Sequence, residues 1–287
     1  MAYVISGTRC SGDRVLGGLM IRFSAIIGSA VITGAFVQLA SAADLSSKVP
    51  LYTPTMAVNW TGFYIGGSVG GRWSDSSWST TAIGSPLGPS DPTTTPASFN
   101  SSSFRAGGYI GYNWQFSPSW VAGVEADAAW GHNSKTLAGI PGTFGPTGFG
   151  VDAGAQAFDS SNVKLGWDGS VRGRVGYLIT PTWLVYATGG VAWQQVDINA
   201  ACAGSFFNSS WCVAPRNETV STTRTGWTVG GGIETLLWNN WLLRAEYRYA
   251  DYGNIGHTFF GGTGIDEVAM TESLKTHTGL IGLAYKF

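Results

Sequence analysis

Apolar and polar residues alternate with a period of two in eight stretches of the chain, the spacing of a β-strand whose two faces meet different surroundings. In the clearest stretch, Phe104, Ile110 and Trp114 share one face, and Arg105 and Asn113 lie on the other. Each stretch has the ~9–11 residues that a transmembrane strand needs. We predict strands over residues 60–71, 104–116, 120–130, 167–179, 183–193, 226–237, 241–249 and 276–287.

All charged side chains in these stretches fall on the less apolar face. A soluble barrel would place its charges outside, but this chain has only 11% charged residues, against ~25% in an average soluble domain. In a membrane barrel the apolar face meets lipid and the charged face lines the lumen, because an Arg on the lipid face costs ~2–4 kcal/mol at the midplane. The predicted lumen charges are Arg105, Glu125, Asp127, Asp168, Arg172, Arg174, Glu234, Arg244, Glu246, Arg248 and Lys286.

The connections between the predicted strands alternate between short and long. Residues 117–119, 180–182 and 238–240 are tight turns rich in Ser, Thr, Pro and Asn, whereas four longer connections span roughly 73–103, 131–166, 194–225 and 251–275. This alternation is typical of outer-membrane barrels. The chain is therefore predicted to be all-β: an eight-stranded antiparallel transmembrane β-barrel with three short periplasmic turns and four long extracellular loops.

Tryptophans gather at two levels of the predicted lipid-facing surface. Such girdles are expected where a barrel crosses the two membrane–water interfaces. Packing in a soluble core would not explain the two levels. The level at the turns comprises Trp114, Trp120, Trp183 and Trp241, and the level at the loops comprises Trp130, Trp167, Trp193 and Trp227.

Composition excludes several other classes of protein. The 42 glycines argue against a helical protein, and no run of about 20 apolar residues follows position 45. The net charge is −1 and there is no basic block, so nothing indicates nucleic-acid binding.

The N-terminus has the features of an export signal. An apolar stretch from Phe23 to Leu39 precedes Ala40-Ser41-Ala42, a small-x-small cleavage site. Translation starts at Met1 with a long leader or at Met20; an anchoring helix is the alternative interpretation of the stretch. We predict a signal peptide over 1–42, a periplasmic tail over 43–58 and the barrel over 59–287.

Two of the three cysteines, Cys202 and Cys212, fall in one predicted loop of the mature chain. An oxidising compartment permits a disulfide between them. A metal site is the alternative, but two cysteines without a nearby histidine do not match metal-ligand patterns. We predict the disulfide and no bound metal or cofactor.

Four motifs resemble those of a known family. Residues 59–67 (NWTGFYIGG), 108–115 (GYIGYNWQ), 186–190 (YATGG) and 278–287 (TGLIGLAYKF) are similar to strands of the RopB-type outer-membrane proteins of alphaproteobacteria, often called outer-membrane immunogenic proteins, within the OmpA-like barrel group. The resemblance implies a surface-exposed protein in the outer membrane of a Gram-negative bacterium, surrounded by membrane lipid and lipopolysaccharide. It also implies that Tyr285 and Phe287 form the signal that barrel-assembly machinery recognises. Family members are described as surface antigens, envelope-stabilising proteins, small porins or haemin binders.

The lumen charges bear on function because eight strands enclose an interior that side chains can just fill. Six basic and five acidic residues in so narrow a space favour a salt-bridged plug over a wide pore. The first hypothesis is therefore a barrel that acts in envelope structure and as a surface antigen. The alternatives are a small porin that passes ions or very small solutes, and a haemin-binding surface protein.

Histidines offer two further possibilities. His132 and His257 lie near the predicted outer rim, where an imidazole could ligate haem iron. His132 and Ser134 also form the His-x-Ser pair that lipid A deacylase barrels use, but no carboxylate can be assigned to orient the histidine. We therefore predict that the protein is not an enzyme.

Overall fold

The computed structural model describes residues 58–84, 96–142, 159–202, 212, 214–262 and 267–287. The predicted signal peptide, the tail up to residue 57 and Cys10 lie outside these ranges. Within them, no helix is long and apolar enough to cross a membrane. The strands are β1 (Gly62–Ile83), β2 (Ala97–Ser98), β3 (Ser101–Ser117), β4 (Trp120–Ala138), β5 (Ser160–Thr180), β6 (Trp183–Cys202), β7 (Arg216–Leu236), β8 (Trp241–Phe259) and β9 (Val268–Lys286), and a short 3₁₀ turn, η1 (Trp238–Asn240), precedes β8.

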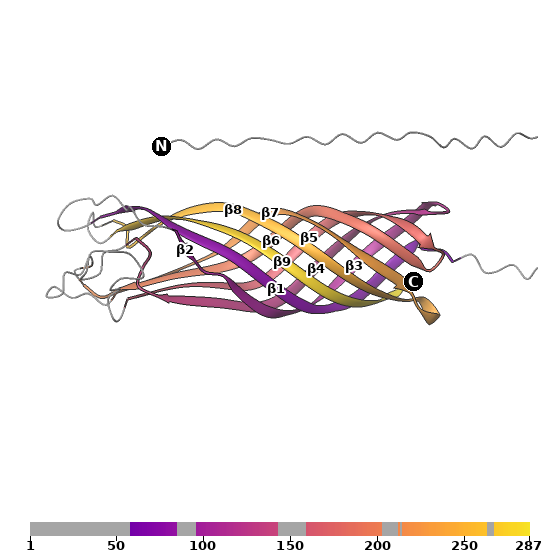
Figure 1. Cartoon of the computed structure of the whole chain (residues 1–287), viewed down its shortest axis with the longest axis horizontal. Coiled ribbons are helices and arrows are strands. Elements are labelled where there is room, and N and C mark those ends of the chain that lie inside the picture. The colour runs from indigo at the N-terminus through magenta and orange to yellow at the C-terminus, as the bar shows by residue number, and fades with distance from the viewer. Residues whose placement is uncertain (1–57, 85–95, 143–158, 203–211, 213, 263–266) are drawn as a thin grey trace, which may run out of the picture. The chain divides into compact units, whose positions relative to one another are not determined.

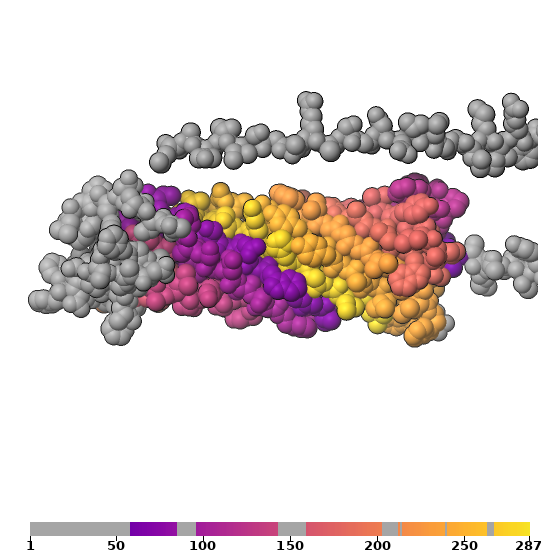
Figure 2. Space-filling model, in the orientation of Figure 1, coloured from indigo at the N-terminus to yellow at the C-terminus, as the bar shows by residue number. Residues whose placement is uncertain are grey.

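The strands form one closed antiparallel barrel. Each of β3 to β9 pairs with its neighbour in sequence, and β1 closes the ring by pairing with both β3 and β9. Figures 1 and 2 show this closure as indigo β1 beside yellow β9, with all strands running obliquely around the barrel. The two-residue β2 pairs with the upper part of β1, so the ring itself has the eight strands that the alternation predicts.

The three short turns fall where the sequence places them. Ser117 and Trp120 bound one, and Thr180 and Trp183 bound another. In the third, Asn240 has φ = 67°, a left-handed conformation that asparagine tolerates better than most residues.

The strands are much longer than the membrane requires. They run for 17 to 22 residues, apart from β2, and continue well beyond the tryptophans of the outer girdle. The prediction that residues 73–103, 131–166, 194–225 and 251–275 are loops is therefore wrong at both ends of each stretch. At the other end of β1 the correction is small, because the strand begins at Gly62 rather than at residue 60.

An inversion of polarity along the strands, clearest in β6, explains the error. In β6 every second side chain, from Leu184 to Cys202, points inward. Up to Trp193 the outward residues are apolar; beyond it, Gln195, Asp197 and Asn199 face outward, while Val196 and Ile198 point into the barrel. The upper part thus has the inside-apolar pattern of a soluble barrel, and a search for lipid-facing apolar residues stops at the girdle.

Inward glycines make room for large side chains in the narrow lumen. A Cβ on Gly111 would lie 2.3 Å from Tyr64 Oη, and one on Gly282 would lie 3.1 Å from Arg244 Nε. Because neither neighbour is at the open surface, these positions require the absence of a side chain. Part of the glycine richness of the chain therefore serves the packing of the lumen.

The inversion of polarity makes a testable distinction between two positions of β7. Val229 faces lipid between the two girdles, and exposed Thr223 lies beyond the outer girdle on the same face. Val229→Arg is expected to lower the free energy of unfolding in micelles by about 2 kcal/mol. Thr223→Arg is expected to change it by less than about 0.5 kcal/mol. Equal losses from the two variants would contradict the assignment of the membrane boundary.

Candidate functional site

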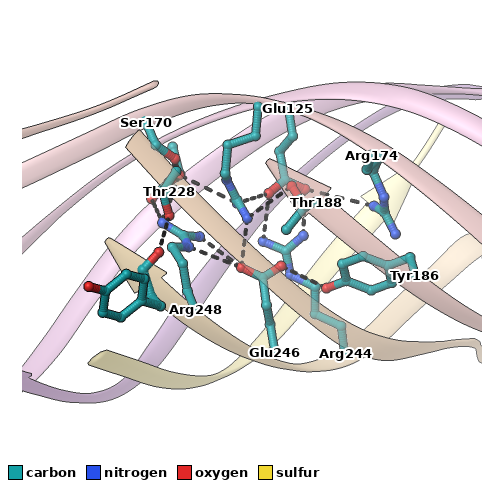
Figure 3. Close-up of polar contacts among 12 residues, drawn as sticks. Glu125, Ser170, Arg174, Tyr186, Thr188, Thr228, Arg244, Glu246 and Arg248 are labelled. Carbon is teal, nitrogen blue, oxygen red and sulfur yellow. Dashed lines mark hydrogen bonds and ion pairs between the residues drawn. The ribbon is translucent and has the colours of Figure 1, made fainter. Parts of the chain in front are cut away.

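The centre of the lumen holds a continuous network of paired charges (Figure 3). Glu125 of β4 lies 2.5 Å from Arg172 of β5 and 2.5 Å from Arg244 of β8. Arg172 also pairs with Glu246 at 2.8 Å, and Glu246 pairs with Arg248 at 2.9 Å. These side chains come from strands on different sides of the ring, so the ion pairs connect the barrel walls across the lumen.

The network continues toward the extracellular end. Asp127 pairs with Arg248 at 3.0 Å and with Arg105 at 2.7 Å, and Ser170 donates a hydrogen bond to it. Asp168 then binds both Arg105, at 2.6 Å, and Arg72, at 2.8 Å. Arg72 is not among the predicted lumen charges, because it lies one position beyond the end of the predicted first strand.

Arg72 is the most highly coordinated cation at this level. Besides Asp168, its guanidinium donates to Asn133 Oδ1 at 2.8 Å and to Gln194 Oε1 at 3.1 Å. All three acceptors belong to different strands, and the side chain of Arg72 is almost fully buried. Hydrogen bonds to this many acceptors offset the cost of removing the cation from water.

Tyrosines complete the periplasmic half of the network, and the sequence analysis did not single them out. Tyr64 donates to Glu125 at 2.9 Å, and Tyr186 donates to Glu246 at 2.8 Å. The Arg244 guanidinium lies 3.6 Å from the centre of the Tyr109 ring, a cation–π contact. The two-residue alternation of the strands places all three rings in the lumen, and this alternation alone would have predicted them as lumen residues.

Ten of the eleven predicted lumen charges form ion pairs, including Arg174 with Glu234 at 2.9 Å. Lys286 does not belong to the network, so its inclusion in the prediction was wrong. It is the last residue of β9, at the end of the barrel where the short turns lie. It donates to the backbone oxygen of Thr61 at 3.3 Å, and it has no ion pair with another described residue. The ten paired charges are Arg105, Glu125, Asp127, Asp168, Arg172, Arg174, Glu234, Arg244, Glu246 and Arg248.

Apolar layers lie above and below the charges. The outer layer packs Trp78 between Phe99 and Phe259, with ring centres 5.9 and 5.4 Å apart, inside the part of the barrel that projects beyond the girdle. The inner layer centres on buried Trp60, whose indole nitrogen donates to Pro181 O at 3.0 Å. The interior of the described barrel is therefore layered: apolar, charged, apolar.

One ion pair lies inside the outer layer. Arg224 pairs with Glu272 at 3.1 Å, and Ser76 donates to the same carboxylate at 2.6 Å. Burial raises the pKa of the Glu272 carboxyl above its usual value despite these two contacts. Arg224 and Glu272 fall in predicted loops, and for that reason they are not among the predicted lumen charges.

The two loop cysteines form a disulfide, and most of the predicted girdle tryptophans are exposed on the outer surface. Cys202 and Cys212 are joined, with an S–S distance of 2.00 Å, and both are buried in the outer layer. Trp130 and Trp167 are direct cross-strand partners at the outer girdle. Trp73 of β1, which the sequence analysis did not include, is half-exposed at the same level. Exposed on the lipid-facing surface are Trp114, Trp120, Trp130, Trp167, Trp183, Trp227 and Trp241, with Trp193 partly buried and the C-terminal Tyr285 and Phe287 exposed.

The histidines do not form a recognisable reactive site in the described part of the chain. His257 Nε2 lies 3.1 Å from Glu218 Oε1, and His132 belongs to a different strand, β4. Ser134 Oγ accepts a hydrogen bond from Asn162, and no hydrogen bond connects it to His132. Among the described residues, no group of three or more His, Cys, Asp or Glu side chains could hold a metal ion. This geometry adds no support for haemin binding or for a deacylase.

Together, the closed ring, the lipid-facing apolar band and the paired lumen charges define an outer-membrane β-barrel. Residues 29–287 match the family described as outer membrane protein beta-barrel domain, and the chain belongs to this family. It therefore resides in the outer membrane of a Gram-negative bacterium.

Two similar proteins of known name are outer-membrane immunogenic proteins. The 31 kDa outer-membrane immunogenic protein of Brucella melitensis is 30% identical over 270 residues, 90% of this chain and 98% of that protein. The 25 kDa outer-membrane immunogenic protein of the same organism is 30% identical over 88% of this chain and 92% of its own length. Among solved structures, OprG from Pseudomonas aeruginosa covers 80% of this chain and 97% of its own, with 13% identity and a TM-score of 0.48. The names of the two relatives describe outer-membrane antigens rather than enzymes.

Glu125 is the position at which loss of one charge disturbs the network most. Glu125→Gln keeps the size of the side chain but leaves buried Arg172 and Arg244 without a shared counter-charge. We expect the free energy of unfolding, measured by denaturant titration in micelles, to fall by about 3 kcal/mol.

The matched control is Asp75→Asn, because Asp75 is 55% exposed and has only a 3.6 Å contact with His277. Its effect should stay within about 0.5 kcal/mol. A Glu125→Gln barrel as stable as the wild type would show that the lumen charges contribute nothing to folding.

Proposed function

We propose that the protein is a closed barrel that reinforces the outer membrane and is itself a surface antigen, and that it does not conduct solutes. The observation that carries this proposal is the filled interior, in which apolar layers around Trp60 and Trp78 lie on either side of the paired charges. A conducting pore needs a continuous polar path, and the outer layer interrupts it with stacked aromatic rings.

The charges themselves also argue for a structural role. Arg172, for example, contacts Glu125 and Glu246 at once and is essentially inaccessible to solvent. A selectivity filter presents its charges to passing ions, whereas here each charge is engaged by an opposite charge from another strand. The names of the Brucella relatives support the antigen part of the proposal.

Single-channel recording tests the proposal directly. Protein extracted from outer membranes, with its fold verified by heat-dependent migration on gels, is inserted into planar bilayers beside a general porin as positive control. We expect no discrete openings from this protein while the porin conducts. Reproducible openings of one unit size would overturn the proposal and establish the small-porin alternative.

A double variant tests whether the outer apolar layer lies in the path of ions. Trp78→Ala with Phe259→Ala removes the stacked rings of the outer layer and leaves the charged network in place. If the wild type is silent because its interior is filled, this variant should show at most brief, irregular openings, because the charged network still fills the centre of the lumen. If the wild type conducts and the variant has the same unit conductance, the outer layer does not lie in the path of the ions.

A further inference from the structure

The outer surface of the barrel carries a groove at the level of the extracellular girdle. It occupies ≈ 670 Å³ and lies over β4, β5 and β6, beside the first part of β3. The strand register shifts between Trp130 and Asn133 in β4, and between Leu165 and Asp168 in β5, so two irregularities face each other here. Gly166 lies at the second, where a Cβ would come within 2.6 Å of Gln195 Oε1.

The groove has an apolar and a polar half. Phe104, Trp130 and Trp167 line the half nearer the membrane, and Trp130 exposes 69% of its surface. Lys164, His132 and Asp197 line the half beyond the girdle. A ligand that fits must therefore combine a large apolar part with a polar head, and it must lie at the membrane surface.

Two polar groups of the groove have unused bonding capacity. Lys164 and Asp197 are cross-strand partners, yet no ion pair joins them, and the Lys164 ammonium pairs with no other described residue. Asp197 Oδ1 is buried and has no hydrogen-bond partner. An unpaired cation beside an unsatisfied acceptor fits a ligand that carries both an anion and hydrogen-bond donors.

Because the girdle marks the outer-leaflet interface, the available amphiphile is the glycolipid of that leaflet. We propose that this groove binds a phosphorylated glucosamine lipid of the lipid A type. A phosphate accepts from Lys164 and His132, a sugar hydroxyl or amide donates to the carboxylate of Asp197, which lines the groove, and acyl chains pack on Phe104, Trp130 and Trp167. This assignment rests on the outer-membrane location and does not depend on whether the lumen conducts.

The opposite side of the barrel provides the matched control. Lys275 of β9 is also exposed beyond the girdle, but its cross-strand partners are Asp75 and Asp251. Two neighbouring carboxylates, against the single one of Asp197 beside Lys164, oppose the binding of a phosphate there more strongly. Lys275 tests whether any lysine at this height suffices or whether the groove itself is needed.

The experiment measures lipid retention by native mass spectrometry. Delipidated protein in detergent is titrated with bisphosphorylated lipid A, with the same lipid after removal of its phosphates, and with phosphatidylglycerol. We expect one strongly retained lipid A per barrel, and affinities at least about tenfold lower for the dephosphorylated lipid and for Lys164→Gln. Lys275→Gln should bind like the wild type.

Other outcomes would overturn the proposal in distinguishable ways. Equal retention of phosphatidylglycerol and lipid A would show binding of any anionic lipid, without recognition of the sugar. Equal losses from Lys164→Gln and Lys275→Gln would show a general charge effect. No adduct with any lipid would exclude the site. Lys164→Gln removes no ion pair, so it should fold, and heat-dependent gel migration verifies this for each variant.

Discussion

The closure of eight strands into a ring forces every inward side chain into one narrow lumen, and the rest of the structure depends on this constraint. A charge in such a space cannot reach water, so it must meet an opposite charge from another strand. Arg172, held between Glu125 and Glu246, shows the result: the ion pairs both neutralise the interior and connect distant strands. Glycines such as Gly111 provide the space that these large side chains require.

The outside of the barrel depends on a different constraint, the depth of the membrane. Between the girdles the outward residues are apolar; beyond Trp193 they become polar, and the apolar residues move inside. The same strands therefore build a membrane barrel below and a barrel with a soluble-type core above. The interior changes from charged to apolar at the level of Arg72 and Gln194, where hydrogen bonds from one guanidinium reach three strands. The proposed closure concerns the inner surface of the barrel at this level, and the proposed lipid groove lies on its outer surface.

The sequence predicted the ring, its turns and ten of the paired charges because a period of two assigns each residue to a face. Arg72 escaped because it lies one position beyond the predicted first strand. Arg224 and Glu272 escaped because the inversion of polarity removes the apolar outward residues by which the strands were recognised. Lys286 points inward like the paired charges, but it lies at the end of β9, away from the network, and contacts the backbone oxygen of Thr61 instead of a carboxylate. The groove at Lys164 could not be predicted, because it arises from register shifts that leave no periodic trace.

The central claim, that the lumen is closed from both sides, is tested most directly by thiol labelling. Ser170 lies among the central charges and is buried, whereas Thr223 is exposed on the outer surface. Ser170→Cys and Thr223→Cys barrels in lipid vesicles are treated with a small charged maleimide under conditions that leave the native disulfide intact. A closed lumen predicts rapid modification of Cys at 223 and none at 170 until the barrel is unfolded. Comparable rates at both positions in the folded barrel would show that water and small solutes enter the lumen, and would contradict the account.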